Sequence, residues 1–183
     1  MQWVAAGSSP LRKIAIFARC PLRERERRHM EQDRNFMKEA LAQARKALEL
    51  GEVPIGAVVV CRGRVISRGH NMTETLHDAT AHAEMIALTA ATEAVGGKYL
   101  NDCTLYVTVE PCPMCAAAMC WAQLGRLVYG ADEPKRGYTL FSAPAENPGG
   151  EPRTLLHPRT ETVKGVLEED CSALMKEFFK TKR

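Results

Sequence analysis

Two short segments of this 183-residue chain carry side chains that could bind a metal and move protons. They are His82-Ala83-Glu84 and Pro111-Cys112-Pro113-Met114-Cys115. The two cysteines are three residues apart, so on a helix they lie on one face. Together with His82 they supply three nitrogen and sulfur ligands, the protein's share of a catalytic zinc site whose fourth position is left to water. The spacing therefore predicts one zinc ion bound by His82, Cys112 and Cys115.

Glu84 is not needed as a ligand in this scheme, but its carboxylate suits proton transfer. Zinc lowers the pKa of a bound water to about 7 and so generates hydroxide near neutral pH. Addition of hydroxide to a ring carbon that bears an amine requires a group that carries the water proton to a ring nitrogen and then to ammonia. The H-x-E…P-C-x-x-C pattern is the known signature of zinc nucleobase deaminases. We therefore interpret Glu84 as the catalytic proton shuttle.

Two other uses of the cysteine pair stay open at this point. A C-x-x-C pair can be a redox pair, although here it stands beside prolines and is accompanied by an H-x-E segment. A purely structural zinc would need a fourth protein ligand, and it would leave Glu84 without a role. The candidates for that fourth ligand are Cys103, Cys120, His70 and His77.

The elements that position these residues can be predicted from hydrophobic periodicity and turn residues. Helices are expected over residues 33–50, 82–95, 113–123 and 167–180. Gly51 and Gly96 suit the C-terminal ends of the first two helices, and Thr80 can cap the second at its N-terminus. Strands are expected over residues 55–61, 65–69, 104–109, 127–129 and 162–166. Both segments with candidate chemistry thus lie at the start of a helix.

The order of these elements predicts a layered α/β domain with a mixed sheet. The first two strands flank Arg62-Gly63, a pair of turn residues that favours an antiparallel hairpin. The strand, helix and strand within residues 104–129 imply a right-handed crossover and parallel pairing. Residues 142–159 are rich in proline and glycine and are expected to form a loop.

The basic charge of the chain is concentrated near its N-terminus. The formal net charge is +3, but residues 1–29 hold seven basic and two acidic side chains, so the other residues carry a net charge of −2. We expect residues 1–29 to be a disordered leader or an over-extended start, and residues 30–183 to form the zinc-dependent deaminase domain.

Composition also limits the class of protein. No apolar stretch approaches the roughly 18 residues of a membrane helix, so an integral membrane protein is not expected. The chain has seven cysteines, an odd number, and no convincing export signal. These features favour a reducing, cytoplasmic environment over a disulfide-bonded protein.

Several runs of the sequence carry a resemblance to a known family. From about Arg34 to Arg183 the chain resembles the bacterial tRNA-specific adenosine deaminases, which have a three-layer α/β/α cytidine-deaminase-like fold with a central mixed five-stranded sheet. The matching runs are EVPIGAVVV at 52–60, TAHAEM at 80–85, LYVTVEPCPMC at 105–115, VYGA at 128–131 and GVLEEDC at 165–171, followed by FF at 178–179.

The resemblance implies a homodimer that deaminates the wobble adenosine of a tRNA anticodon stem-loop to inosine. It also implies zinc bound by His82, Cys112 and Cys115, with Glu84 as the proton shuttle. Asn71 matches a family position that hydrogen-bonds the flipped base, although an asparagine at a strand end can equally stabilise a turn.

An RNA loop should meet basic and aromatic side chains. The first candidates are Lys135, Arg136 and Tyr138. The second set is Lys176, Lys180, Lys182 and Arg183, which can equally be a solvated helix end that complements the helix dipole.

Two other functions use the same residues. A deaminase of a free base or nucleoside, of guanine or cytosine type, would have the same zinc site. A non-catalytic RNA-binding protein could keep zinc as a structural element, but such a protein does not need Glu84.

Overall fold

The computed structural model describes residues 21–142 and 154–181, in which five strands form one sheet with the order β2-β1-β3-β4-β5. β1 (Gly56–Cys61) pairs antiparallel with both β2 (Arg64–His70) and β3 (Cys103–Val109). β3, β4 (Arg126–Ala131) and β5 (Glu161–Val163) are parallel. The mixed sheet is confirmed, including the parallel pair on either side of the crossover helix.

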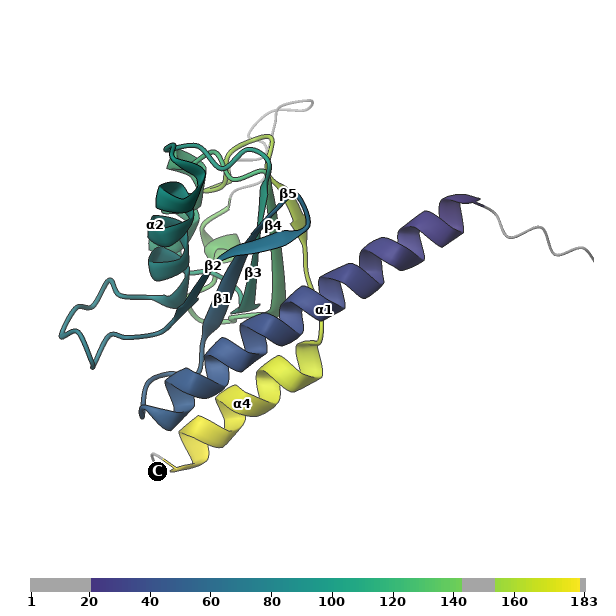
Figure 1. Cartoon of the computed structure of the whole chain (residues 1–183). Helices are drawn as coiled ribbons and strands as arrows, with labels where there is room; N and C mark the ends of the chain where they lie inside the picture. Colours follow the sequence, from purple (N-terminus) through teal and green to yellow (C-terminus); the bar gives the residue numbers. More distant parts are fainter. Residues whose placement is uncertain (1–20, 143–153, 182–183) are drawn as a thin grey trace, which may run out of the picture.

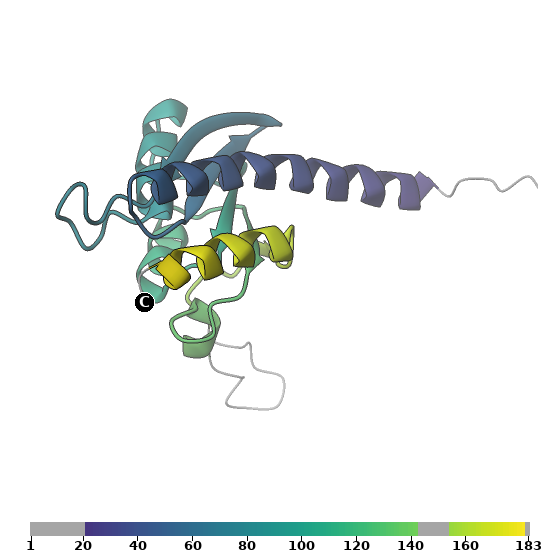
Figure 2. The same ribbon diagram turned by 90° about the horizontal axis from the view of Figure 1, so that it is seen from below.

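The helices form two layers, one on each face of the sheet. α1 (Pro21–Glu49) and α4 (Glu168–Thr181) lie side by side on one face, while α2 (Ala83–Val95) lies on the other (Figure 1). α3 (Pro113–Trp121) shares the α2 side, and a short 3₁₀ helix, η1 (Tyr138–Phe141), follows β4. The view from below shows α1 and α4 together in front of the sheet (Figure 2). The predicted three-layer α/β/α fold is confirmed.

Alternation along the strands divides the apolar side chains between two cores. In β3, Leu105 and Val107 lie in the core under α2 and α3. Tyr106, between them, packs in the core under α1 and α4. Successive side chains of a strand point to opposite faces, so a sheet covered on both sides needs apolar residues at every position. This requirement explains the uninterrupted apolar runs of β1 and β3.

The turn residues act largely as predicted. Arg62 and Gly63 both have positive φ angles, 50° and 76°, as a two-residue hairpin between β1 and β2 requires. Gly96, with φ of 68°, is the C-cap residue of α2. The prediction that Thr80 caps α2 is wrong. The Thr80 hydroxyl donates to Asp78 instead, and the N-cap position belongs to His82.

α1 begins twelve residues earlier than the sequence pattern predicts. Its first residue is Pro21, whereas its buried positions begin at Asp33. Residues 25–32 are exposed, and this part of the helix extends past the sheet (Figure 1). Glu24 pairs with Arg27 there at 3.3 Å. A helical stretch without a buried face has no hydrophobic periodicity, which is why the pattern missed it. Most of the expected leader, residues 1–20, lies outside the described residues, as do residues 143–153 of the expected loop.

None of the helices within the described ranges is both long and apolar enough to cross a membrane.

A buried ion pair ties α1 to the sheet. Asp33 is 7% exposed and accepts a hydrogen bond from the Tyr106 hydroxyl at 2.8 Å. Its two oxygens also accept from the Arg126 guanidinium, at 2.7 and 2.9 Å. This carboxylate raises the pKa of Arg126 further above its ordinary value. The fork of two parallel bonds fixes the first buried turn of α1 against β3 and β4.

We expect Asp33→Ala to lower the free energy of unfolding by about 2 kcal/mol, because it leaves Arg126 and Tyr106 without their shared acceptor. Urea denaturation followed by circular dichroism measures this loss. The matched control is Glu39→Ala on the same helix, which removes an ion pair with Arg68 whose two side chains are each 48% exposed. That exposed pair is worth less than about 1 kcal/mol, so equal losses in the two variants would contradict the assignment.

Candidate active site

The two segments with candidate chemistry meet where two helices begin. His82 is the N-cap residue of α2, with φ of −71° and ψ of 153°. Cys112 is the N-cap residue of α3, with φ of −72° and ψ of 167°, and Pro113 follows it as the first helical residue. An N-cap residue has extended backbone, so His82 and Glu84 need not diverge as two such residues inside a helix would.

Three ligand atoms converge at this point. The Nδ1 atom of His82 lies 3.6 Å from Cys112 Sγ and 3.5 Å from Cys115 Sγ. All three ligand atoms lie within 4.8 Å of one another, and Cys115 is fully buried. Zinc–sulfur bonds of about 2.3 Å and zinc–nitrogen bonds of about 2.0 Å place ligand atoms at such separations. The group can therefore bind one metal ion, as the sequence spacing predicts.

The protonation of the group favours a thiolate. The hydrogen bond from Cys115 and the neighbouring His82 lower the pKa of Cys112 to about 4. The hydrogen bond between His82 and Cys112 raises the pKa of His82. The separate hydrogen bond between Cys115 and Cys112, together with burial, raises the pKa of Cys115. A thiolate is the form of cysteine that binds metal, and binding a metal would displace the remaining protons.

Glu84 lies beside the metal group and is almost fully buried. Its residue is 3% exposed, and its Oε2 atom has no hydrogen-bond partner in the described part of the chain. Burial raises the pKa of this carboxyl group. A buried carboxylate oxygen without a partner requires an explanation, and a ligand or water held by the metal group would supply one. The donor set and this oxygen together fit a zinc site.

No fourth protein ligand completes the group among the residues that the structure describes. The candidates for such a ligand, Cys103, Cys120, His70 and His77, lie outside the cluster. A zinc ion with three protein ligands retains an open position, which is the arrangement of catalytic rather than structural sites.

Asn71 lies next to the start of α2. It follows β2 directly, is 3% exposed, and its backbone N–H donates to Ile55 O at 3.0 Å. The next residue, Met72, donates to Ala81 O at 3.0 Å, one residue before His82. A Cβ atom on Gly69 would lie 2.3 Å from Ala83 O, so only glycine allows β2 to approach α2 this closely. The structure thus places the segment that contains Asn71 against the segment that leads into His82.

Lys135 and Arg136 lie in an exposed loop between β4 and η1. Tyr138 N donates to Pro111 O at 2.9 Å, which places this loop beside the residue that precedes Cys112. The expectation that Tyr138 is available to stack on RNA is wrong, because this side chain is 5% exposed and packs in the core under α2 and α3. Packing against apolar neighbours buries the aromatic ring and leaves it unavailable for stacking on a base.

The second basic set lies on α4. Lys176 and Lys180 are exposed near the end of this helix, while Lys182 and Arg183 lie outside the described residues.

Two buried carboxylates outside the metal group each hold a loop, and neither role is predictable from the sequence pattern. Glu110 is 6% exposed and accepts hydrogen bonds from Glu133 N at 3.0 Å and from the hydroxyl of Thr139 at 2.7 Å. A Cβ atom on Gly137 would lie 2.3 Å from the Glu110 carboxylate, so the loop wraps closely around it. Glu52 likewise accepts hydrogen bonds from the loop of residues 71–75. The sequence offers one signal for both residues, because Glu52 and Glu110 each stand at the end of an apolar run, where an acidic side chain that becomes buried needs hydrogen-bond donors.

The comparisons with known proteins agree with this geometry. The family described as the cytidine and deoxycytidylate deaminase zinc-binding region matches residues 30–131. A tRNA-specific adenosine deaminase of Bacillus subtilis is 46% identical over 156 residues, which cover 84% of this chain and 92% of that protein.

Two solved structures extend the comparison. One, from a study of A-to-I editing by tRNA:A34 deaminases at the wobble position, is 42% identical with a TM-score of 0.66 and covers 76% of this chain and 98% of its own. A guanine deaminase of Bacillus subtilis is 35% identical with a TM-score of 0.54, covering 64% of this chain and 81% of its own. This chain belongs to the cytidine and deoxycytidylate deaminase zinc-binding family, within its tRNA-specific adenosine deaminase branch.

Proposed function

We propose that this protein is a zinc-dependent deaminase that converts adenosine to inosine at the wobble position of a tRNA anticodon. The observation that carries the proposal is the convergence of His82, Cys112 and Cys115 beside the buried carboxylate of Glu84. The assignment of the substrate is supported by the 46% identity to a tRNA-specific adenosine deaminase. The reaction consumes adenosine and water and yields inosine and ammonia.

The residues of the chain divide the chemical work. His82, Cys112 and Cys115 would hold zinc, which when bound activates water for addition to the ring carbon that bears the amine. Glu84 takes one proton of the attacking water on its carboxylate and passes it to a ring nitrogen, and it then carries the second proton, from the hydroxyl group now on the ring carbon, to the departing ammonia. Asn71 holds the flipped base by a hydrogen bond to its side-chain amide oxygen. This division assigns a task to each polar side chain that the site gathers.

An RNA substrate must be held by local charge rather than by the field of the whole domain. Residues 30–183 carry a net charge of −2, so the net charge of the domain does not attract RNA. Lys135 and Arg136 are exposed in the loop whose Tyr138 N–H donates to Pro111 O, and they are the proposed contacts to the backbone of the anticodon loop. A tRNA substrate also implies a cytoplasmic location, which remains a prediction.

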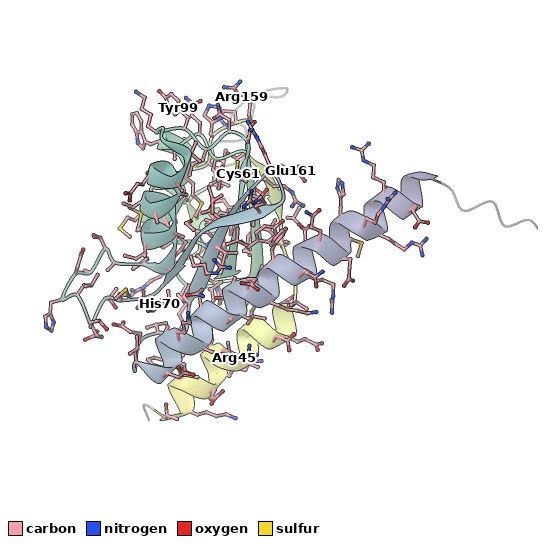
Figure 3. The ribbon with its side chains drawn as sticks, viewed as in Figure 1. Arg45, Cys61, His70, Tyr99, Arg159 and Glu161 are labelled. Atoms are coloured by element: carbon pink, nitrogen blue, oxygen red, sulfur yellow. The ribbon has the colours of Figure 1, made fainter. Side chains whose placement is uncertain are left out.

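We expect the double variant Lys135→Ala/Arg136→Ala to bind an anticodon stem-loop about tenfold more weakly, because each lost phosphate contact weakens electrostatic binding. The slope of log affinity against log salt concentration should fall by about 0.7 for each contact. Fluorescence anisotropy over a salt series measures both quantities. The control is Lys98→Ala/Arg159→Ala, since both residues are exposed. Figure 3 shows Arg159 and Tyr99, the residue after Lys98, at the same end of the molecule. Equal losses in the two variants would remove Lys135 and Arg136 from the RNA interface.

A second candidate function is deamination of a free base. It is favoured by the 35% identity to a guanine deaminase structure, which spans 64% of this chain. Ammonia release from free guanine, cytosine and adenosine, measured beside inosine formation in an anticodon stem-loop, separates the two functions. We expect turnover of the stem-loop, and turnover of the free compounds alone would overturn the proposal.

We further propose that the active protein is a homodimer. Trp121 at the end of α3 is 84% exposed, and Phe141 in the adjoining η1 is 60% exposed. Exposed aromatic side chains on adjoining elements are typical of surfaces that another chain covers. Light scattering in solution tests this, with a mass twice that of the chain expected and a mass equal to one chain contradicting it.

A further inference from the structure

Glu52 is a buried carboxylate that lies apart from the metal group. It is fully buried in the turn between α1 and β1, and its backbone N–H donates to Ala47 O at 2.9 Å. Its Oε1 atom accepts from the backbone and hydroxyl of Thr75, at 2.7 and 2.8 Å. Its Oε2 atom accepts from Asn71 Nδ2 at 3.0 Å, Glu74 N at 3.2 Å and Thr73 Oγ1 at 3.3 Å. One carboxylate therefore holds the whole segment 71–75.

These donors keep Glu52 ionised. Burial on its own raises the pKa of Glu52, but the hydrogen bonds from Thr75, Glu74 and Thr73 outweigh it and bring the pKa below its ordinary value. An ionised carboxylate has no proton to donate and can only accept. Any polar group against Glu52 must therefore present a donor.

This constraint orients the side-chain amide of Asn71. The Nδ2 atom lies 3.0 Å from Glu52 Oε2 and 3.0 Å from Thr73 Oγ1, so the amide nitrogen is directed into the network. A flipped amide would place Oδ1 against the Glu52 carboxylate, so that two acceptors would face each other without a proton between them. The bonds that Nδ2 donates to Glu52 and Thr73 would then be lost. Because Nδ2 is held in this way, Oδ1 is the atom of Asn71 left for another partner.

Asn71 is also held beside the metal group from its backbone. The hydrogen bonds Asn71 N to Ile55 O and Met72 N to Ala81 O join this segment to the residue before β1 and to the residue before His82. Figure 3 shows His70, the preceding residue, at the end of β2 where the loop toward α2 begins. The segment 71–75 is thus fixed between Glu52 on one side and the start of α2 on the other.

We propose that Glu52 is a positioning residue that holds the Asn71 amide with Oδ1 toward the substrate, so that the pocket accepts a hydrogen bond from the reacting nucleotide. The inference rests on the proposed function, because it requires Asn71 to contact the substrate. The resulting specificity is for a nucleotide that offers an N–H or O–H donor at this position.

A donor and acceptor exchange tests the proposal. Glu52→Gln replaces one of the two acceptor oxygens by an NH2 group, so the network loses an acceptor, and an NH2 group that faces Asn71 opposes Nδ2. Asn71→Asp turns the amide into a carboxylate, which opposes the carboxylate of Glu52. In the double variant Glu52→Gln/Asn71→Asp, the glutamine amide donates to the new aspartate, whose other oxygen remains an acceptor for the substrate. The double variant loses the bond to Glu74 N, but residue 74 is exposed and water can replace it.

We expect each single variant to lower kcat/KM by about 10- to 100-fold, because a buried polar group is left without its partner. The double variant should recover to within about tenfold of the wild type. The assay uses whichever substrate the wild type converts, a stem-loop or a free base, with zinc content measured in parallel and expected to be unchanged. If the fold-loss in kcat/KM of the double variant equals the product of the two single fold-losses, the proposed orientation of the Asn71 amide is wrong.

The matched control is Glu110→Gln/Asn71→Asp. Glu110 is also a buried carboxylate that holds a loop beside the site, but it bonds to residues 133 and 139 rather than to Asn71. The fold-loss in kcat/KM caused by Glu110→Gln should therefore multiply with the fold-loss caused by Asn71→Asp, without rescue in the double variant. Rescue in this control as well would show that the effect is not specific to Glu52.

A second measurement does not depend on turnover. The side-chain amide protons of Asn71, followed by ¹⁵N NMR, should exchange slowly with solvent in the wild type and at least about tenfold faster in Glu52→Gln. Free exchange in the wild type would overturn the inference whatever the substrate is. Failure of the proposed function alone would instead appear as a wild type that does not convert the stem-loop but still protects these protons.

Discussion

Glu84→Gln is expected to lower kcat by about 1,000-fold or more while the zinc content stays that of the wild type. Glutamine has nearly the same shape as glutamate but cannot accept the proton of water and return it to the product. Glu84 is 3% exposed, so bulk water cannot easily take over the transfer. The removed group is also not one of the three that converge as metal ligands. Ammonia release under saturating substrate and zinc analysis of the same sample measure the two quantities.

The control for this variant is Glu93→Gln. Glu93 lies on the same helix, α2, but is exposed and distant in sequence from the metal group. It should keep the wild-type rate and zinc content. A Glu84→Gln protein with a near-wild-type rate would remove Glu84 from the shuttle role, and one without zinc would assign it to the metal site instead.

Cys112→Ala is expected to lose both metal and activity. The three ligand atoms lie within 4.8 Å of one another, and the described residues near them provide no substitute donor to complete the set. Removing the thiolate that His82 and Cys115 favour should leave less than about a tenth of the wild-type zinc after dialysis, because catalytic zinc sites depend on all three protein ligands. Zinc analysis by mass spectrometry after dialysis measures the loss.

Cys120→Ala is the matched control for Cys112→Ala. Cys120 lies on the same helix, α3, and is a free, partly exposed cysteine outside the metal group. It should retain wild-type zinc and turnover. Full zinc occupancy in Cys112→Ala would refute the ligand assignment, and equal loss in Cys120→Ala would point to damage of the helix rather than of the site.

Hydrophobic patterning predicted the helices and strands that have a buried face, and it missed the helical residues that have none. The strands β1 and β3 and the buried part of α1 follow directly from apolar runs and helical spacing. The exposed extension of α1 before Asp33 has no such pattern. Thr80 matched the preference for an N-cap residue, but Asp78 competes for its hydroxyl. Local preference is a weak guide where a loop supplies another partner.

The metal group was predictable because its residue types are rare and each of its two segments, H-x-E and P-C-x-x-C, has a short and recognisable internal spacing. His82 and the two cysteines could be assigned before any geometry was known, since each segment begins a helix. The roles of Glu52 and Glu110 could not, because their partners lie 19 to 29 residues away and are mostly backbone N–H groups and hydroxyls. Such contacts depend on how loops fold back on the sheet. They carry no pattern in a single sequence.

The most direct test of the central claim is the position of inosine in a set of tRNA transcripts incubated with the purified zinc-loaded protein. Nuclease digestion and mass spectrometry locate every inosine that forms. We expect inosine at the wobble position of a transcript that has adenosine there, and at no other adenosine. Absence of inosine from that position, with ammonia released from a free base under the same conditions, would contradict the assignment of this chain as a tRNA adenosine deaminase.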